Sequence, residues 1–379
     1  MTPISYIELS KEALLHNVTA LRGIVPMDHF TAVVKANAYG HGLEEIVAML
    51  GSEPDAFQVD DLDELRQLRQ LNDGWALVYG YVRLADLEEV SRLRGEVVVF
   101  SVDQIAELAR IHELYLTTDN PDFMVRFSIK IDALLGRQGI LPDEIDNFIE
   151  ELAKYPDLEP TSAYAHYANI EDTTDLTHAE AQEEAFQSAY AKLEARWPRI
   201  GRHISATSGV MAREKGPPYN SMVRLGIGLY GLYPSAPLAR SHADLGLRPV
   251  MRWVSHLAQV KTLPAGHPVG YGLTYRTIRP TKIGIVPQGY SDGYDRGLSN
   301  VGEVLVHGKR CPVIGRIAMN MFAIDLTPAP DARAEDEVVL LGSQGEDRIT
   351  AEEIASKLGT INYEVVARVS PLLPRVIED

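Results

Sequence analysis

The sequence predicts an α/β protein in which an N-terminal (β/α)8 TIM barrel is followed by a mainly β domain. Over the first two-thirds of the chain, eight short apolar runs alternate with amphipathic helical patterns, which is typical of a parallel barrel. After about Pro234, short strand-like runs separated by glycine and proline replace this alternation. A length of 379 residues is also too great for one ordinary domain. We therefore expect a barrel over residues 9–235 and a β domain over residues 236–379.

The elements of the barrel follow in order along the chain. Ser10 can cap a first helix that runs from Lys11 to about Leu21. The expected strands are Phe30–Lys35, Ala56–Val59, Ala76–Tyr81, Glu96–Val102, Met124–Asp132, Thr161–Tyr167, His203–Ser208 and Met222–Tyr230. Helical patterns lie between most of them, at Leu43–Leu50, Leu62–Leu71, Asp103–His112, Asp143–Lys154 and His178–Arg196. A doubly wound sheet is the competing arrangement for such an alternation.

The second domain is expected to be built from short strands joined by turns. The expected strands are Leu257–Leu263, Lys282–Val286, Glu303–Val306 and Glu337–Leu341, with one helix near Thr350–Leu358. No low-complexity linker or internal repeat separates the two halves. We therefore expect the junction between them to be packed.

Composition and charge exclude several classes of function. Apolar residues make up 45% and charged residues 23% of the chain, as in an ordinary globular protein. With 53 acidic and 36 basic side chains, the net charge of -17 opposes binding to nucleic acid or to anionic lipid. No apolar run is long enough to span a membrane, and the N-terminus has no signal-peptide pattern, so we expect a cytoplasmic protein.

The single cysteine, Cys311, excludes an intramolecular disulfide and a cysteine-based metal cluster. We expect it to be a small buried side chain, and we expect no metal site.

The sharpest local feature of the sequence is Ala32-Val-Val-Lys35-Ala-Asn37-Ala-Tyr39-Gly-His41-Gly42. A lysine at the end of an apolar strand is costly to bury as a cation. At the rim formed by the carboxyl ends of barrel strands, Lys35 could instead form a Schiff base with the aldehyde of a cofactor, which removes the charge. The alternative is a lysine whose ammonium reaches solvent from the strand end.

This segment closely resembles the pyridoxal 5'-phosphate (PLP) motif of the alanine racemase family, and the resemblance extends over nearly the whole chain. Further matches, in the family's order and with similar spacing, are Lys130-Ile-Asp132 through Gly136-Arg137-Gln-Gly139, His166-Tyr-Ala, Ser205-Ala-Thr-Ser208, Val223-Arg224-Leu-Gly226-Ile227-Gly-Leu-Tyr230-Gly231, Val269-Gly-Tyr271-Gly, Gly289-Tyr290-Ser-Asp292-Gly293-Tyr294, Gly315-Arg316-Ile-Ala-Met319-Asn320 and Ile361-Asn-Tyr363-Glu364. The resemblance implies a cofactor-bearing barrel, a β domain that also takes in an N-terminal strand (residues 1–8), and a head-to-tail homodimer.

The resemblance also implies two opposed acid/base groups. Lys35 would hold the cofactor and serve one face of the substrate, and Tyr271 of the partner subunit would serve the other face. Inversion needs two groups because the proton leaves one face of a planar α-carbon and a new one arrives on the opposite face. A tyrosine with its reference pKa of roughly 10 is a poor base near neutral pH, so its phenolate must be stabilised. In the family a hydrogen-bond chain does this, and His166 and Arg224 match its positions.

The cofactor contacts that the resemblance implies surround Lys35. Arg224 would face the pyridine nitrogen, where a permanent cation disfavours protonation of the ring and restrains side reactions such as transamination. The phosphate would be held by backbone amides and by hydroxyl groups, as is common after the last two strands of a barrel. These are the amides of Ser208, Gly226 and Ile227 and the hydroxyls of Ser208, Tyr39 and Tyr363.

The substrate contacts are implied in the same way. Arg137 and the Met319 backbone would receive the substrate carboxylate. Lys130 matches a lysine that is often carbamylated in the family and positions this arginine. Tyr290 would line the entrance with Tyr363.

The sequence departs from the family pattern at positions that flank the substrate. Leu134 replaces a glycine that is usual in the loop carrying Arg137, and Asn320 stands where an aspartate is common. Thr207 stands where an asparagine is common, and Leu225 where a proline is frequent. These departures bear on the identity of the substrate and on the turnover more than on the fold or the cofactor.

Three alternatives to an alanine racemase stay open. A racemase of another small amino acid, such as serine, differs by only a methyl or hydroxyl contact in the pocket. A barrel-type decarboxylase would need a cysteine near the substrate, for which Cys311 is the one candidate. A non-catalytic PLP-binding carrier would keep Lys35, although such carriers are generally a lone barrel.

Overall fold

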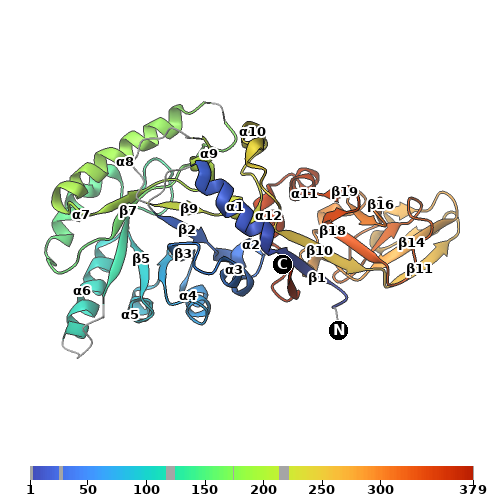
Figure 1. The fold of residues 1–379 in the computed structure, drawn as a ribbon, viewed down its shortest axis with the longest axis horizontal. Helices are drawn as coiled ribbons and strands as arrows, with labels where there is room; N and C mark the ends of the chain where they lie inside the picture. The colour runs from blue at the N-terminus through green and yellow to red at the C-terminus, as the bar shows by residue number, and fades with distance from the viewer. Residues whose placement is uncertain (1–2, 25–28, 117–123, 174, 213–221, 379) are drawn as a thin grey trace.

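The computed structural model describes residues 3–24, 29–116, 124–173, 175–212 and 222–378. The chain forms two parts that lie end to end (Figure 1). One is a barrel with its surrounding helices, and the other is a mainly β domain. Strands β1 and β10 run from the barrel side into the β domain.

Eight parallel strands form the barrel, as the sequence predicts. They are β2 (Phe30–Val33), β3 (Ala56–Val59), β4 (Trp75–Val78), β5 (Gly95–Val99), β6 (Arg126–Lys130), β7 (Ser162–Tyr164), β8 (Gly201–His203) and β9 (Val223–Leu225). Neighbouring strands pair in chain order from β2 to β8, and β9 pairs with β2. A parallel bridge between Ala206 and Arg224 links the remaining two edges, so the barrel is nearly closed. The doubly wound alternative is wrong, because such a sheet stays open.

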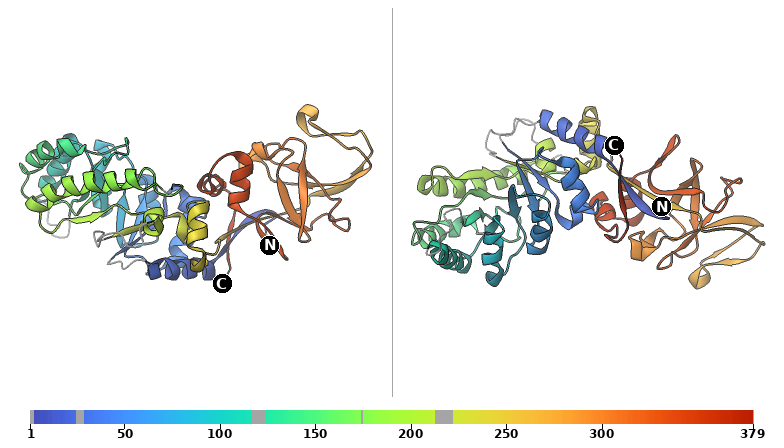
Figure 2. Two further views of the ribbon diagram at one scale, coloured as in Figure 1. Left: turned by 90° about the horizontal axis from the view of Figure 1, so that it is seen from above. Right: turned by 60° about the horizontal axis from the view of Figure 1, so that its bottom comes forward.

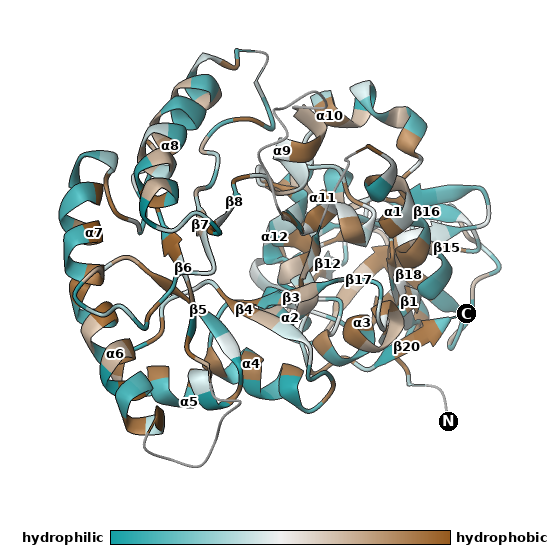
Figure 3. Ribbon diagram, turned by 60° about the vertical axis from the view of Figure 1, so that its left-hand side comes forward, coloured by the Kyte–Doolittle hydropathy of each residue, from teal (hydrophilic) through white to brown (hydrophobic). Residues whose placement is uncertain are grey.

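Helices cover the outside of the barrel (Figures 1 and 2). They are α1 (Lys11–Ile24), α3 (Leu43–Leu50), α4 (Leu62–Arg69), α5 (Leu87–Arg92), α6 (Val102–Leu116), α7 (Ile145–Leu152), α8 (Thr177–Arg196), α9 (Thr207–Ala212) and α10 (Ala236–Ser241). The Ser10 hydroxyl accepts a hydrogen bond from the Ala13 amide at 3.1 Å, which is the cap expected for α1. Figure 3 shows hydrophilic and hydrophobic residues alternating along α6, α7 and α8, as expected for helices with one face on a core.

The β domain contains a ten-stranded sheet and a separate two-stranded hairpin. The sheet strands are β1 (Tyr6–Ser10), β10 (Met251–His256), β11 (Gln259–Leu263), β14 (Thr281–Val286), β15 (Glu303–Val306), β16 (Lys309–Ile314), β17 (Phe322–Asp325), β18 (Glu337–Gln344), β19 (Asp347–Ile349) and β20 (Arg375–Glu378). The hairpin pairs β12 (Pro268–Val269) with β13 (Tyr275–Arg276). Strand β1 pairs antiparallel with β10 and parallel with β20, so the N-terminal segment lies inside this sheet.

Two helices of the β domain, α11 (Ala351–Leu358) and α12 (Asn362–Ala367), face the barrel. Helix α12 contacts α2 (Lys35–Tyr39), the segment that carries the candidate cofactor lysine. The Arg375 guanidinium donates to the Gly40 carbonyl at 2.7 Å, and the Asn362 amide donates to the Tyr233 carbonyl at 2.9 Å. One cluster of buried apolar residues extends through both parts. The junction is therefore packed.

The single cysteine is buried, as the sequence predicts. Cys311 is fully buried on β16, and burial raises the pKa of its thiol to about 12. In the described part of the chain, no helix combines the length and the apolar character that crossing a membrane requires.

Candidate active site

The lysine lies in an unusual backbone turn at the end of β2. From Ala36 to Tyr39 four consecutive residues have φ between 52° and 54°, which is the left-handed helical region. This conformation costs roughly 1–2 kcal/mol for each residue other than glycine. Gly40, with φ 80°, ends the turn, and a Cβ there would lie 1.9 Å from the Val366 carbonyl oxygen of α12. Only glycine fits at that position.

A half-buried carboxylate holds the lysine turn in place. Glu64 of α4 accepts hydrogen bonds from the amides of Ala36 at 2.6 Å, Asn37 at 3.4 Å and Asp60 at 2.8 Å. Burial raises the pKa of Glu64, and the three amides oppose that rise. The Asn37 side chain in turn accepts from the Leu43 amide at 2.9 Å. Contacts from α3 and α4 therefore offset the backbone cost of the turn.

Lys35 pairs with an aspartate that the sequence analysis does not identify. Its Nζ lies 3.1 Å from Asp60 Oδ1, at the end of the neighbouring strand β3. The two side chains are 41% and 51% exposed, so the ammonium meets both a carboxylate and solvent. A Cβ on Gly80 would lie 2.3 Å from the Asp60 carbonyl oxygen, which is why a glycine stands next to it. An acidic residue directly after a barrel strand is the signal that could have found Asp60.

Arg224 lies in the barrel interior and contacts two histidines, the candidate His166 and also His203. Its guanidinium hydrogen-bonds to Nδ1 of His203, and it lies 3.4 Å from Nδ1 of His166. It also donates to the carbonyls of Ala165 at 3.1 Å and Ile204 at 3.2 Å. Burial and the Arg224 charge hold the pKa of both imidazoles well below the usual value, so both are neutral at physiological pH. The structure thus brings together His166 and Arg224, as the resemblance implies, and adds His203.

Lys130 is buried with its Nζ 4.7 Å above the Tyr164 ring. Within the described part of the chain no hydrogen-bond partner lies within reach of that nitrogen. Burial, together with the charges of Arg224 and Arg137, holds its pKa well below the usual value. An amine in such a place is suited to modification that supplies the missing hydrogen bonds.

The loop that carries Arg137 folds around a single carboxylate. Asp132 accepts hydrogen bonds from the amides of Leu135, Gly136 and Arg137, each at 3.0 Å. The Arg137 side chain is exposed at this rim. Leu134 keeps a φ of 59° although it is not glycine, and its side chain is 52% exposed. The backbone expected of a glycine is therefore preserved in this loop at a cost in strain.

The residues expected to bind a phosphate lie together and already bind an anionic group. Hydroxyls of Ser208 and Tyr363 donate to the Glu171 carboxylate, whose pKa is raised mainly by burial. Tyr39 is close enough to Tyr363 for their ring centroids to lie 6.2 Å apart.

The backbone beside these hydroxyls is shaped by a glycine. A Cβ on Gly226 would lie 2.6 Å from the Tyr39 hydroxyl oxygen, so glycine is required for that approach. The Gly226 amide donates to Thr207 Oγ1 at 3.1 Å, and a phosphate would have to share this donor. Ile227 begins the short 3-10 helix η3 (Ile227–Tyr230) directly after β9.

The remaining candidates gather on the β domain. Tyr271 lies in η5 (Tyr271–Leu273), whose Gly272 approaches the Arg316 side chain. The Met319 carbonyl accepts from the Ser291 amide at 3.0 Å, and the Asn320 amide group donates to Ser291 Oγ at 2.8 Å. Exposure is high throughout this group, at 73% for Tyr271, 54% for Met319 and 43% for Tyr290. The candidates thus form two groups in one chain, one at the barrel rim and one exposed on the β domain.

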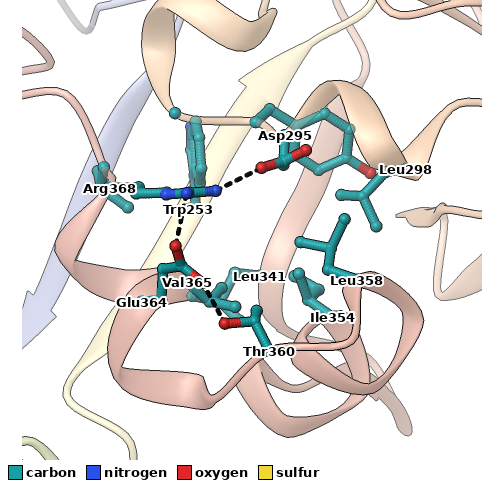
Figure 4. A pocket seen from close by; sticks show the side chains of 13 residues that line it. Trp253, Asp295, Leu298, Leu341, Ile354, Leu358, Thr360, Glu364, Val365 and Arg368 are labelled. Carbon is teal, nitrogen blue, oxygen red and sulfur yellow. Dashed lines mark hydrogen bonds and ion pairs between the residues drawn. The ribbon is translucent and has the colours of Figure 1, made fainter.

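A separate hollow in the β domain is not part of either group (Figure 4). It lies between α11, α12 and β10, and its lining is mainly apolar, with Trp253, Leu298 and Ile354 among the lining residues. Arg368 spans its edge through ion pairs with Asp295 at 2.6 Å and Glu364 at 2.5 Å. We interpret it as a packing defect between helices and sheet.

Fold and site together define a (β/α)8-barrel enzyme with an appended β domain and a lysine at the carboxyl-end rim. Residues 9–234 match the family model "Alanine racemase, N-terminal domain", and residues 250–377 match "Alanine racemase, C-terminal domain". The chain belongs to the alanine racemase family.

Individual relatives agree with this assignment along the whole chain. The alanine racemase of Syntrophobacter fumaroxidans is 36% identical over 95% of this chain and 94% of its own, and that of Carboxydothermus hydrogenoformans is 35% identical over 99% and 100%. The crystal structure of alanine racemase from Streptomyces lavendulae superposes with a TM-score of 0.91 at 31% identity, covering 100% of this chain and 98% of that one. The enzyme from Bacillus anthracis has a TM-score of 0.90 at 29% identity, covering 100% and 96%.

Proposed function

We propose that this protein interconverts L- and D-alanine with PLP as its cofactor. The observation that carries the proposal is the position of Lys35 directly after strand β2 at the barrel rim. Arg224 lies on the adjacent strand β9 and contacts His166, and the hydroxyls of Ser208 and Tyr363 donate to a carboxylate nearby. The relatives over the full length of the chain are named alanine racemases.

The residues present fit this cofactor at three points. Lys35 combines partial exposure with a strand-end position, where its amine can reach an aldehyde. The Ser208 and Tyr363 hydroxyls already donate to a carboxylate, so the same place suits a phosphate. Arg224 has only donors and keeps its charge, which suits a ring nitrogen that accepts a hydrogen bond.

In the proposed mechanism, PLP supplies an electron sink that makes the α-hydrogen of the amino acid acidic. The Lys35 amine takes or gives the proton on one face of the α-carbon. The Tyr271 hydroxyl of a second subunit takes or gives it on the other face, so each turnover inverts the centre. His166 hydrogen-bonds to Arg224 and would pass the influence of that charge to the tyrosine.

The proposed homodimer follows from the two groups of candidates. Tyr271 and Met319 are more than half exposed on the β domain of their own chain, together with the apolar Leu273 and Ile278 at 56% and 89%. An exposed apolar patch of this kind is typical of an interface. A head-to-tail arrangement would place this group over the barrel rim of the partner and complete two sites at once.

Substrate binding is proposed to use the strained loop. The Arg137 guanidinium would pair with the substrate carboxylate, with the Met319 backbone as a second contact. A carbamate on Lys130 would give this buried nitrogen acceptor oxygens that can orient Arg137. Tyr290 would line the entrance with Tyr363. We propose that the reaction takes place in the cytoplasm.

The test is chiral chromatography of purified protein incubated with PLP and a panel of L-amino acids. We expect D-alanine to form fastest. Faster inversion of serine would replace alanine by serine as the substrate, and release of carbon dioxide without inversion would favour a decarboxylase. If the α-hydrogen of no amino acid exchanges with solvent deuterium, the protein is a PLP carrier.

A further inference from the structure

A continuous chain of buried polar side chains crosses the barrel interior from β5 to β9. Each of five consecutive strands contributes one residue: Glu96, Ser128, Ser162, His203 and Arg224. All five are at most 4% exposed, in the layer of the barrel beneath the candidate site. Buried polar groups of this number are retained only when each is hydrogen-bonded.

The contacts run without a break. His203 Nδ1 meets the Arg224 guanidinium, and His203 Nε2 lies 3.1 Å from Ser162 Oγ. Ser162 Oγ lies 2.6 Å from Ser128 Oγ, which donates to Glu96 Oε1. The Glu96 carboxylate also accepts from Trp75 Nε1 at 2.9 Å and from the Tyr79 hydroxyl at 3.5 Å.

The chemistry of the two ends fixes the direction of every hydrogen bond. A guanidinium can only donate, so His203 Nδ1 must accept and its proton must lie on Nε2. That proton is donated to Ser162, which then donates to Ser128, which donates to Glu96. The Tyr79 hydroxyl, 3.3 Å from His203 Nε2, offers a parallel route to the same carboxylate.

Stacked rings hold the plane of the imidazole. The ring of Tyr164 is stacked on those of both Tyr79 and His203, with centroid distances of 4.4 Å and 5.2 Å and interplanar angles of 15° and 11°. The ring of His203 therefore cannot turn to exchange its two nitrogens without disturbing two tyrosines.

We propose that Glu96 is a positioning residue for Arg224, acting through His203. Its carboxylate is the final acceptor of a one-directional hydrogen-bond chain that keeps His203 Nδ1 an acceptor. The guanidinium is thereby held in one orientation toward the cofactor ring. The expected effect on catalysis rests on the proposed function. The expected tautomer of His203 does not depend on it.

Glu96→Gln tests the proposal because it keeps the shape and removes the charge. An amide group facing Ser128 can donate, which allows the chain to reverse and His203 to place its proton on Nδ1, against Arg224. We expect ¹⁵N NMR of the histidine side chains to show the Nε2-protonated form of His203 in the wild type, and a changed tautomer in the variant. We expect kcat for alanine to fall by roughly tenfold, as for one charged hydrogen bond, with KM changed less than about twofold.

Two further variants keep the test decisive. Ser162→Ala removes the serine route and leaves only the longer Tyr79 contacts, of 3.3 Å to His203 and 3.5 Å to Glu96, so it should also lower kcat, even if Glu96→Gln does not fold. Trp75→Phe removes another partner of Glu96 outside the chain and should leave the His203 tautomer and kcat unchanged. A rise in the pyruvate formed per racemisation event is expected in Glu96→Gln and Ser162→Ala, because a loosely held Arg224 restrains transamination less well.

Wild-type kcat together with an unchanged His203 tautomer in both Glu96→Gln and Ser162→Ala would overturn the proposal. The NMR measurement is made on the protein with and without PLP. If the wild type racemises no amino acid, the proposed function fails while the His203 prediction is still decided.

Discussion

The imidazole of His41 is stacked on the Tyr230 ring, with the ring centroids 4.4 Å apart and the planes inclined by 26°. His41 follows the lysine turn, and its Nδ1 lies 3.1 Å and 3.0 Å from the carbonyls of Ala38 and Tyr39. Tyr230 in turn donates to the Val33 carbonyl at 2.8 Å. Because Nδ1 must donate to these carbonyls, Nε2 carries no proton, and among the described residues it has no hydrogen-bond partner. The pair joins the lysine turn to η3, the short helix that follows β9, and needs His41 to be neutral.

This relationship predicts a loss of stability in mild acid. Burial lowers the pKa of His41 to about 4 from 6.5. Between these values the unfolded chain binds a proton that the folded protein does not, so the free energy of unfolding falls as pH falls below 6.5 and levels off near 4. The contribution of His41 alone is about 3 kcal/mol. Urea unfolding curves recorded at pH values spaced by roughly one unit, from about 7.5 to about 4.5, would give the free energy of unfolding at each pH.

His41→Phe is the control for this pH effect. Phenylalanine keeps the ring on Tyr230 but cannot titrate, so the variant should be less stable than the wild type at pH 7.5 and lose less stability on acidification. An identical pH slope in the two proteins would assign the acid sensitivity to the other buried imidazoles, those of His166 and His203, whose pKa values are also lowered by burial.

Leu134→Gly should leave the protein as stable or raise the free energy of unfolding by up to about 1 kcal/mol. A leucine with φ 59° is strained, and glycine relieves this strain at the cost of a more flexible unfolded chain. Leu141 provides a matched control, because it is also about half exposed, at 51%, but has φ -67°. Leu141→Gly should lower the free energy of unfolding by about 0.5–1 kcal/mol. If thermal unfolding shows equal losses in the two variants, Leu134 makes contacts that outweigh its backbone strain.

The sequence is informative about the barrel because its strands are short, apolar and separated by amphipathic helices. Helix α3 spans the expected Leu43–Leu50, whereas the six-residue α5 is too short to show a helical period. The left-handed turn after Lys35 has no local signal, since alanine does not favour positive φ. It forms because Glu64 binds its amides from another helix.

The sequence predicts residues of the candidate site only where a residue type is unusual for its expected secondary structure. Lys35 at a strand end and the glycines near it meet this condition, whereas Asp60, Glu64 and Glu171 resemble ordinary surface carboxylates. Their burial and partners depend on residues distant in sequence. Glu96 is the exception, since a charged residue at the start of Glu96-Val-Val-Val inside an apolar strand is a signal of a buried polar contact.

Glu171→Gln should tighten PLP binding by about threefold to tenfold. The Glu171 carboxylate uses the Ser208 and Tyr363 hydroxyls that are proposed to hold the phosphate, so it competes with the cofactor and repels it. Titration of the protein freed of cofactor, followed by the absorbance of bound PLP, would measure the affinity. Asp172→Asn changes the neighbouring, exposed carboxylate and should have a smaller effect. Weaker binding in Glu171→Gln would mean that this carboxylate orients the hydroxyls for the phosphate.

Two inactive variants should restore activity when mixed, if each site takes Lys35 from one subunit and Tyr271 from the other. In a dimer of Lys35→Ala with Tyr271→Phe, one site carries both changes and the other carries neither. After random exchange of subunits, about a quarter of the wild-type racemase activity should return. Mixing Lys35→Ala with Arg224→Ala should restore none, because both residues belong to the barrel and each site then carries one change. The expected arrangement is contradicted if the two mixtures recover equal activity. It is also contradicted if neither mixture recovers activity after subunit exchange has been verified. In either case Tyr271 would lie in the same site as the Lys35 of its own chain, or outside the site altogether.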